Sequence, residues 1–284
     1  MGNLIRVDAE LVRRGLAHSR AQAAELIQQG RVYVDGGIVR KPARQMDKAQ
    51  ALLVKEVQTT QWVSRGAYKL LGALEELGDA APQIEGVRAL DAGASTGGFT
   101  QVLLEKGASH VVALDVGYGQ LAWILREDPR VTVIERTNVR SLDPERVAPA
   151  PHLVVGDLSF ISLTLVLPAL VQAASADADF LMMVKPQFEV GKQSVGAHGV
   201  VRDPALHAEA VIKVAQCARE LGLGIQAIAP SPLPGPSGNV EYFLLMKAHA
   251  ADQLSQRLDA AVEDVVAHGP AGSGENTAWT ASES

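Results

Sequence analysis

The sequence is poor in the residues that hold small extracellular domains and metal sites together. It has one cysteine, Cys217, in 284 residues, so neither an internal disulfide nor a cysteine-rich zinc site can form. Its seven histidines include no pair at the spacing that places two ligands on one helix face. These absences favour a reducing, cytoplasmic setting, and we predict that the protein holds no metal ion.

Long apolar runs are also absent. The longest tract, residues 163–184, is interrupted by proline and by polar side chains, so it cannot cross a bilayer as one helix. The interrupting residues are Pro168, Gln172, Asp177 and Asp179. The first residues show no apolar core typical of a secretory signal. We therefore expect no membrane association.

Charge is unevenly distributed along the chain, although the net charge is only −6. Residues 1–60 hold ten Lys and Arg against six Asp and Glu, whereas the remainder holds 16 against 26. A basic first segment on an acidic body suggests that the first segment meets a polyanion. A solvated basic face explains the same composition, and charge alone does not separate these two interpretations.

Residues 1–58 are predicted to form a small α+β unit. Within residues 6–29, two short helices are split at Gly15, and Ser19 can cap the second. The stretch RVYVDGGIVR then predicts a hairpin that turns at Asp35-Gly36, because alternating valines meet a favoured two-residue turn. If this unit contacts a polyanion, we expect the contacts to come from Arg6, Arg13, Arg14, Arg20 and Lys41, with Arg65 just beyond the unit.

From residue 65 to residue 250, short apolar runs alternate with helical stretches. This pattern predicts an α/β fold with a doubly wound, largely parallel sheet. Residues 59–64 are predicted to be a linker, and Ser64 to cap the first helix of the body. Residues 251–284 are expected to form one amphipathic helix, up to residue 266, and a disordered tail. The predicted strands are residues 87–91, 110–115, 131–135, 152–157, 180–185, 224–229 and 241–247.

The segment DAGASTGGFT, residues 91–100, follows the first of these strands and admits three interpretations. A dinucleotide site needs G-x-G-x-x-G, but Ser95 replaces the middle glycine, and its side chain opposes close approach of a pyrophosphate. A hydrolase elbow needs G-x-S-x-G, which residues 93–97 match, with His249 later in the chain. No HGGG-like oxyanion loop precedes this serine, which counts against the hydrolase without excluding it.

The third interpretation is a nucleoside pocket that holds no pyrophosphate. Asp91 ends the strand, the glycines allow a tight turn, and the helix start at Gly98-Phe99 can face a carboxylate. Asp115 ends the next strand, where an acid can accept hydrogen bonds from both ribose hydroxyls, and Asn138 can bond a base edge. Carboxylate, ribose and adenine together make S-adenosylmethionine, which fits best. Alternatively, Asp91 and Asp115 are strand-end acids that only cap turns.

Four ionisable residues are expected to meet at one edge of the sheet. Asp157 and Lys185 end neighbouring predicted strands, whose carboxyl ends share one crevice. Glu241 reaches the same edge if the last strand runs antiparallel, and Lys69 lies on the preceding helix. Methyl transfer to a hydroxyl requires a protein to aim a poor nucleophile and remove its proton, which a desolvated lysine beside a second cation can do. The alternative is two ion pairs at the sheet surface.

Taken together, the motifs resemble the TlyA family of rRNA 2'-O-methyltransferases, historically also called haemolysins. The similarity extends to about residue 248 and rests on long, unusual motifs. They are RVDAELVRRGLA, WVSRGAYKL, LDAGASTGGFT, DVGYGQLAW, ERTNVR, DLSFISL, VKPQFEVG and SPLPGPSGNVEY.

The resemblance implies an alpha-L RNA-binding motif followed by an FtsJ-like methyltransferase domain with a Rossmann-like, seven-stranded sheet. It implies a catalytic tetrad at Lys69, Asp157, Lys185 and Glu241, and a linker residue, Trp62, that couples RNA docking to cofactor binding. The implied substrates are cytidine 2'-hydroxyls in 23S rRNA and, for members with a longer start such as this one, 16S rRNA within ribosomal subunits. The residues then expected at S-adenosylmethionine are Asp91, Gly93, Ser95, Thr96, Gly97, Gly98, Phe99, Asp115, Tyr118, Asn138 and Asp157.

Two other functions stay open from the sequence. A pore-forming haemolysin would need a membrane-length or basic amphipathic segment, which the sequence lacks. A ribosome-assembly factor without catalysis would bind RNA and have no affinity for the cofactor. The sequence indicates neither the oligomeric state nor the exact target nucleotide.

Overall fold

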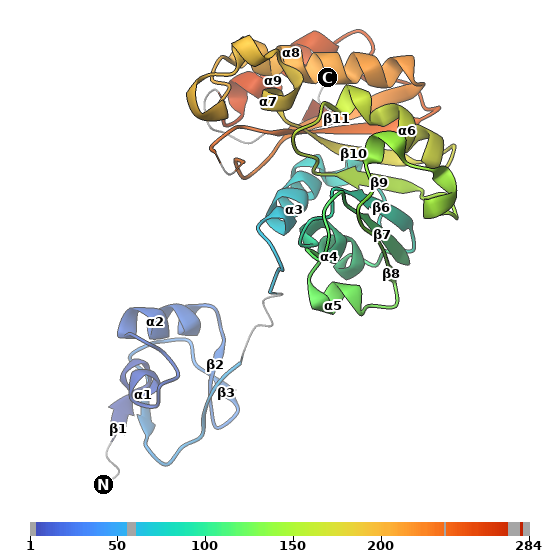
Figure 1. Ribbon diagram of the computed structural model, residues 1–284. Helices are drawn as coiled ribbons and strands as arrows, with labels where there is room; N and C mark the ends of the chain where they lie inside the picture. The colour runs from blue at the N-terminus through green and yellow to red at the C-terminus, as the bar shows by residue number, and fades with distance from the viewer. Residues whose placement is uncertain (1–3, 56–60, 236, 272–278, 281–284) are drawn as a thin grey trace. The chain divides into compact units, whose positions relative to one another are not determined.

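The computed structural model describes residues 4–55, 61–235, 237–271 and 279–280 (Figure 1). The chain divides into two compact units, Met1–Gln61 and Trp62–Ser284. Short helices and strands make up the first unit, and one large sheet covered by helices makes up the second.

The first unit follows the predicted order of elements. Gly15 (φ +72°) separates its two helices, and Ser19 Oγ accepts a hydrogen bond from Gln22 N at 3.2 Å, which confirms the predicted cap. Asp35 and Gly36 both have positive φ, as a two-residue hairpin turn requires. The elements are β1 (Leu4–Arg6), α1 (Val7–Arg13), α2 (Arg20–Gln28), β2 (Val32–Val34), β3 (Gly37–Ile38), β4 (Gln45–Asp47) and β5 (Leu52–Val54).

Two small sheets support this unit, β1-β4 and β3-β2-β5. Apolar side chains from both helices and from β2 and β4 bury themselves in one cluster, which includes Val7, Leu11, Ile27, Val32 and Met46. The sequence LLVKEV at residues 52–57 is also typical of a strand, and the structure has β5 at its start, while residues 56 and 57 lie outside the described part of the chain.

The sheet of the second unit has the order β8-β7-β6-β9-β10-β12-β11-β13, in which β13 (Trp279–Thr280) is a two-residue strand of the tail. Its first seven strands are parallel except β12, which runs antiparallel to both β10 and β11. These seven confirm the predicted doubly wound sheet, and β12 runs in the direction on which the expected position of Glu241 depended. The strands are β6 (Arg88–Ala92), β7 (His110–Leu114), β8 (Val131–Ile134), β9 (Leu153–Gly156), β10 (Asp179–Val184), β11 (Leu223–Pro230) and β12 (Tyr242–Ala248).

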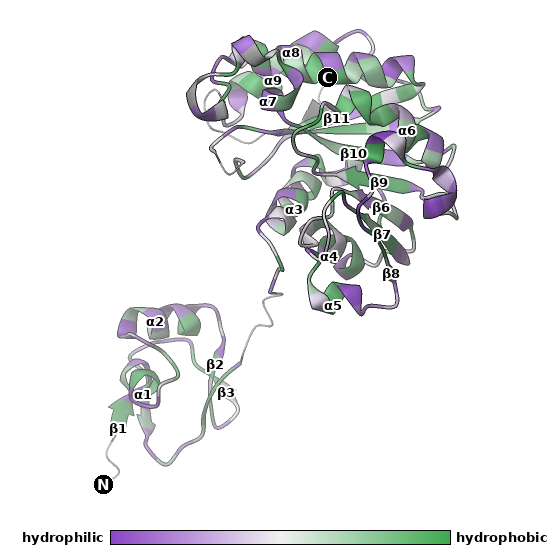
Figure 2. Cartoon of the chain, viewed as in Figure 1, coloured by the Kyte–Doolittle hydropathy of each residue, from purple (hydrophilic) through white to green (hydrophobic). Residues whose placement is uncertain are grey.

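Helices cover both faces of this sheet because successive residues of each strand point to opposite faces and both sets are apolar. In β10, Phe180 and Met182 join the core on one face, and Leu181 and Met183 join the core on the other. Figure 2 shows apolar colouring along the central strands and a mixture of polar and apolar residues along α8. One face packs against α3 (Gly66–Leu77), α4 (Gly98–Glu105) and α5 (Trp123–Arg126), and the other against α6 (Leu167–Ala173), α8 (Pro204–Glu220) and α9 (Leu258–His268).

Short turns of helix connect these elements. A single turn, α7 (Pro186–Glu189), follows β10 directly. The 3-10 turns are η1 (Gly78–Ala80), η2 (Val139–Ser141), η3 (Pro144–Val147), η4 (Leu163–Leu165), η5 (Lys192–Ser194) and η6 (Ala197–Gly199).

Two predicted helix starts are wrong. Ser64 does not cap α3, because the helix begins at Gly66 and Arg65, itself in helical conformation, holds the cap position without a side-chain hydrogen bond. The C-terminal helix begins at Leu258 and not at residue 251, because Asp252 bonds Leu254 N and pairs with Arg219, which holds the intervening residues in a turn.

The predicted linker and tail are only partly described. Residues 59 and 60 lie outside the described part of the chain, while Trp62 and Val63 pack against the core of the second unit. In the tail, Trp279–Thr280 form a two-residue strand, β13, which pairs with β11, so the predicted disorder is wrong there. Residues 272–278 and 281–284 lie outside the described residues. Among the helices that are described, none has both the length and the apolarity needed to cross a bilayer.

A buried histidine ties the start of α8 to the sheet. His207 Nδ1 lies 3.0 Å from the Tyr242 hydroxyl, and His207 Nε2 lies 3.0 Å from the carbonyl oxygen of Val201. Desolvation lowers the pKa of His207 from its ordinary value, although the nearby Asp203 opposes the shift.

Because the folded protein holds His207 neutral, the unfolded chain binds more protons once the pH falls below about 6.5. The unfolding free energy should therefore decrease as the pH falls through this value, and His207→Gln should reduce that pH dependence. Urea unfolding of both proteins at about pH 7.5 and about pH 5.5 measures the two slopes. An unchanged slope in the variant would contradict this assignment.

Candidate active site

The carboxyl edge of the sheet brings together most of the residues predicted to carry chemistry. The strand order reverses between the neighbouring strands β6 and β9, because the chain continues from β6 to β7 on one side and from β9 to β10 on the other. A crevice forms at this point between the loops that follow β6 and β9. The glycine turn follows β6 and leads into α4, and Asp157 follows β9. Lys185 follows β10, and Glu241 precedes the antiparallel β12, so both lie at the same edge.

The glycine turn is shaped by contacts within the protein. Gly93 has φ +88°, and a Cβ there would lie 2.9 Å from the carbonyl oxygen of Asp157. Gly97 has φ +100°, and its Cβ would lie 2.2 Å from Leu125 Cδ1 and 2.9 Å from Leu121 Cδ1. Because both leucines are buried, the turn can pack against α5 only with glycine at position 97.

Asp115 organises the turn from the neighbouring strand. Its Oδ2 accepts from the backbone N–H of Ser95 at 2.8 Å, and its Oδ1 accepts from Gly117 N at 2.6 Å. Ser95 itself has φ +48°, and its hydroxyl donates to Gln120 Oε1 at 3.3 Å. Each Asp115 oxygen keeps a second acceptor position, so the carboxylate can hold the turn and still accept from a bound hydroxyl.

Two connected chambers open at this edge. A chamber of about 310 Å³ lies at the glycine turn and the lysines, and one of about 480 Å³ lies beside Asp115 and Asn138. Gly93, Ser95, Asp157 and Ser159 line both, so the two are parts of one site. Their sizes fall within the range of about 300–1,000 Å³ typical of small-molecule sites.

The two chambers differ in chemistry. The first is lined by charged and polar groups and by the start of α4, including Arg65, Lys69, Thr96, Gly98, Phe99 and Lys185. The second has mainly apolar walls, which include Val116, Val139, Phe160 and Ile161. Its polar groups include Gln120 and Asn138. Asn138 Oδ1 caps η2 by accepting from Arg140 N at 3.0 Å, which leaves its amide N–H groups as donors.

The four residues of the predicted tetrad form one chain of alternating charge. Lys69 Nζ donates to Glu241 Oε2, Glu241 Oε1 lies 4.0 Å from Lys185 Nζ, and Lys185 Nζ lies 2.5 Å from Asp157 Oδ1. The side chains of Lys69, Lys185 and Glu241 are nearly fully buried, and that of Asp157 is 22% exposed. The structure therefore brings all four together, with Asp157 closest to solvent.

Two oxygens of this chain lack a hydrogen-bond partner among the described residues. They are Asp157 Oδ1, which faces Lys185 as an ion pair without hydrogen-bond alignment, and Glu241 Oε1. Both oxygens lie beside the Lys185 ammonium, whose charge offsets the cost of burying them.

A serine and a glutamate that the sequence analysis missed hold the loop after β9. Ser159 Oγ accepts from Lys185 Nζ at 3.0 Å. At the other end of the loop, Glu189 accepts from Ser162 Oγ at 2.5 Å and from Leu163 N at 2.7 Å. Lys185 immediately precedes α7, and Glu189 is the last residue of α7. The loop after β9 is therefore bonded to both ends of this helical turn, which fixes the Lys185 ammonium.

Three predicted cofactor residues do not line either chamber. Asp91 is fully buried beneath the turn, where it accepts from Thr100 Oγ1 at 2.7 Å while its Oδ1 lacks a partner among the described residues. Desolvation raises the pKa of Asp91 to about 7, and the charges of Asp157 and Asp115 add to the shift. Gly97 acts through packing, and Tyr118 is exposed, with the Arg136 guanidinium 4.2 Å from its ring centroid.

The structure excludes the hydrolase arrangement. Ser95 lies at the carboxyl edge of the parallel strands, whereas His249 follows the antiparallel β12 and so lies at the opposite edge. A dinucleotide site is disfavoured because the Ser95 N–H is engaged by Asp115.

The basic residues of the first unit are organised by two buried acids. Arg6 and Arg20 both pair with Asp8, at 2.8 Å and 2.9 Å. Arg13 and Arg14 both pair with Glu10, at 2.5 Å and 2.7 Å. These arginines hold the pKa of both acids below its ordinary range, that of Glu10 at about 2. Lys41 lines an exposed hollow with Arg40 and Arg44.

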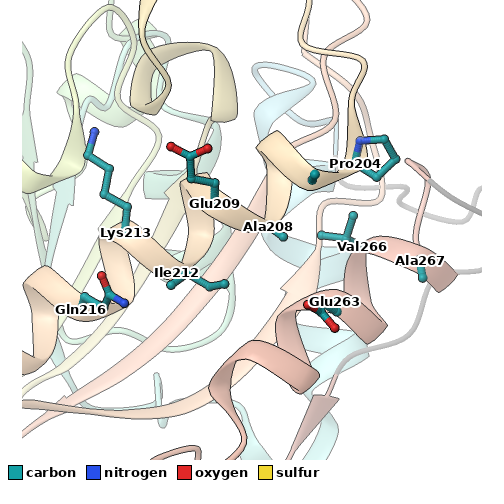
Figure 3. Close-up of a pocket in the computed structure, with 10 residues that line it drawn as sticks. Pro204, Ala208, Glu209, Ile212, Lys213, Gln216, Glu263, Val266 and Ala267 are labelled. Atoms are coloured by element: carbon teal, nitrogen blue, oxygen red, sulfur yellow. The ribbon is translucent and has the colours of Figure 1, made fainter. Parts of the chain in front are cut away.

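Other parts of the described chain offer less to chemistry. The described residues contain no group of three or more His, Cys, Asp or Glu able to hold a metal ion. A groove of about 700 Å³ lies between α8 and α9 (Figure 3), and none of the residues that line it lines either chamber. Its floor is mainly apolar, with Ala208, Ile212 and Val266, and Lys213 on its rim pairs with Glu189.

Comparison with known proteins agrees with this site. The FtsJ-like methyltransferase model matches residues 62–248, and the S4 domain model matches residues 5–48. The fold and the site thus define a methyltransferase of the FtsJ-like class that carries an S4 domain.

Relatives narrow this class further. The chain is 58% identical over 271 residues, 95% of its length and 100% of the relative's, to the "16S/23S rRNA (cytidine-2'-O)-methyltransferase TlyA" of Mycobacterium tuberculosis. It is 33% identical to the "23S rRNA (cytidine-2'-O)-methyltransferase TlyA" of Campylobacter jejuni, with 82% of this chain and 95% of the relative covered. A solved structure from Streptococcus thermophilus, described as a hemolysin, superposes with a TM-score of 0.67 at 33% identity, covering 92% of this chain and 95% of that one. The chain belongs to the TlyA family, and the resemblance inferred from its motifs is confirmed.

Because Gly97 is closely packed, adding a methyl group at this position should reduce both the stability of the protein and its affinity for the cofactor. Gly97→Ala combines an unfavourable φ with a clash against two buried leucines, and we expect it to cost about 2–5 kcal/mol of unfolding free energy. It should also weaken S-adenosylmethionine affinity at least about tenfold, because the turn presents Ser95 and Thr96 to the first chamber. Urea unfolding and calorimetry measure the two effects.

Gly222→Ala is the matched control, because Gly222 has φ +81° with nothing within 4 Å of its Cβ. It should cost only the backbone term, about 1 kcal/mol, and leave cofactor affinity unchanged. Equal losses in the two variants would show that packing against α5 is unimportant.

Proposed function

We propose that this protein transfers a methyl group from S-adenosylmethionine to the 2'-hydroxyl of cytidine in rRNA, in both 16S and 23S rRNA. The observation that carries this proposal is the row of Lys69, Glu241, Lys185 and Asp157 beside the two chambers, in which both lysines line the first chamber and Asp157 lines both. Its rRNA specificity rests on the relatives described above, whose whole length the chain matches.

The residues present fit S-adenosylmethionine. The apolar second chamber and Asn138 suit an adenine, Asp115 suits the ribose hydroxyls, and the start of α4 with the glycine turn suits an amino-acid carboxylate. When bound, this cofactor supplies an activated methyl group, so the protein has only to position the acceptor and remove its proton.

Lys185 is the residue that we assign to the proton of the 2'-hydroxyl. Lys185 lines the first chamber, and its Nζ is held by Asp157 and Ser159, which line both chambers. Glu241, held by Lys69, lies 4.0 Å from the same Nζ and limits the cost of two neighbouring cations. Asp157 also remains the most exposed acceptor of the four, beside the opening through which a ribose would enter.

Replacing Lys185 by Met should lower the rate constant of methylation at least about 100-fold, because general-base catalysis contributes about 10²–10⁴. The affinity for S-adenosylmethionine should change little. Methyl incorporation into unmodified ribosomal subunits and calorimetry with the cofactor measure these two quantities.

Lys106→Met, at the exposed end of α4, is the control for the loss of one positive charge and should methylate at the parental rate. Parental activity in Lys185→Met would overturn the assignment. Loss of cofactor affinity in parallel with activity would show that Lys185 supports the pocket and does not take part in the chemistry.

We also assign residues 1–58 to RNA binding, with Arg6, Arg13, Arg14, Arg20 and Lys41 in contact with phosphates and Arg65 at the entrance of the first chamber. The ion pairs of four arginines with Asp8 and Glu10 support the assignment to RNA binding. Each acid holds two guanidinium groups in fixed directions near the surface. Trp62, packed on the core of the second unit, is assigned to the connection between the two units. The reaction then takes place in the cytoplasm, where ribosomal subunits are found.

Deleting residues 1–58 should abolish methylation of ribosomal subunits almost completely while cofactor binding is kept. The remaining RNA binding should be weaker and less dependent on salt, because fewer phosphates are neutralised. A filter-binding titration at several salt concentrations measures the slope. Retained methylation at the parental rate would show that this unit is dispensable.

A further inference from the structure

An exposed apolar segment beside the second chamber is not used by the chemistry described above. It runs from Val116, shortly after β7, to Ile124, the second residue of α5. The side chain of Trp123 is 72% exposed, and that of Ile124 is 69% exposed. Val116 and Tyr118 in the same segment are also mainly exposed. Contiguous exposed apolar groups of this kind usually mark a binding surface.

The segment is held rigidly, although its apolar side chains face solvent. Gly119 N donates to Glu135 Oε1 at 2.8 Å, and Ala122 N donates to the carbonyl oxygen of Thr96 at 3.2 Å. Leu121 and Leu125 pack beneath it against Gly97. Trp123 is therefore presented on a fixed support, so docking a flat ligand on it costs little conformational entropy.

The surface is continuous with the active site. Val116 and Gln120 line the second chamber, and Thr96, which holds Ala122, lines the first. Figure 1 shows α5 beside α4, next to β8. Val116 and Gln120 therefore connect this segment with the site at which RNA is proposed to react.

Continuity with the proposed RNA site favours a nucleic acid over a protein partner. Arg136 lies over the Tyr118 ring, whereas Arg126 on α5 is already paired with Glu135. Exposed aromatic rings are the groups on which unpaired bases stack, because every base has a π-face.

The geometry points to residues 116–124 as a stacking surface for unpaired rRNA bases next to the target nucleotide, with the Trp123 indole as its main platform. This inference rests on the proposed function and adds a second RNA contact, on the methyltransferase unit itself. It makes Trp123 a residue that binds substrate and does not participate in methyl transfer.

The test compares two replacements of similar apolarity in the full-length protein. Trp123→Phe keeps an aromatic face, and Trp123→Leu removes it. With unmethylated ribosomal subunits as substrate, Trp123→Leu should raise KM roughly 5- to 150-fold, the range for loss of one stacked base, with kcat and S-adenosylmethionine affinity unchanged. Trp123→Phe should stay within about threefold of the parent. Leu165→Ala, an exposed leucine on η4, should change neither constant.

A second measurement identifies the partner. A short unstructured cytidine RNA should quench the fluorescence of the parent protein, and Trp123→Phe should remove most of that quenching. The KM ratio between Trp123→Leu and the parent should stay constant between about 50 mM and about 200 mM salt, because stacking releases no counterions.

Equal KM values for Trp123→Leu, Trp123→Phe and the parent would overturn the inference, as would a fall in kcat at unchanged KM. A KM effect on subunits without quenching by RNA would assign the surface to a ribosomal protein. A dimer that Trp123→Leu dissociates would assign the surface to a second copy of this chain. Either result overturns the inference. If the parent itself methylates no rRNA, the proposed function fails, whereas parental activity that is insensitive to Trp123 removes only this inference.

Discussion

The second unit depends on burying two lysines and two carboxylates in one row of alternating charge. Lys69, Glu241 and Lys185 are almost fully withdrawn from solvent, and an isolated charge in such a place would cost several kcal/mol. Each member is tolerable only because its neighbour carries the opposite sign. Removing one partner leaves its neighbour buried and uncompensated, so the row stabilises itself only as a whole.

The architecture explains how four residues far apart in the chain can share one row. Parallel strands deliver Asp157 and Lys185 at their carboxyl ends, while β12 runs in the opposite direction and delivers Glu241 at its amino end. The helix α3 supplies Lys69 from one face of the sheet. The glycine turn and Asp115 then place a cofactor pocket where the strand order reverses between β6 and β9. Substrate binding is divided between this edge and a separate basic unit, which compensates for the acidic composition of the body.

Much of this could be predicted from the sequence because strand ends are marked by polar residues after apolar runs. Asp157 and Lys185 followed from that pattern, and the glycine turn followed from its spacing, whereas the direction of β12 entered only as a condition for Glu241. Ser159 and Glu189 could not be predicted, since their roles depend on a loop that folds back onto α7 and leaves no periodic signal. Asp91 was assigned to the cofactor, but the strand pleat turns its carboxylate into the protein, where it bonds Thr100. The helix start at residue 251 was misplaced because Asp252 holds a turn there, and Ser64 lies one residue before the cap position of α3.

The antiparallel insertion of β12 between β10 and β11 also governs when the protein can become active. The contact between Lys69 and Glu241 joins residues separated by 172 positions, and β12 is the last strand of the seven to leave the ribosome. Until it enters the gap between two strands that are already synthesised, Lys69 has no carboxylate to face and Lys185 faces Asp157 alone. A nascent or truncated chain can therefore assemble the glycine turn early and remain without a working set of charges until synthesis is nearly finished.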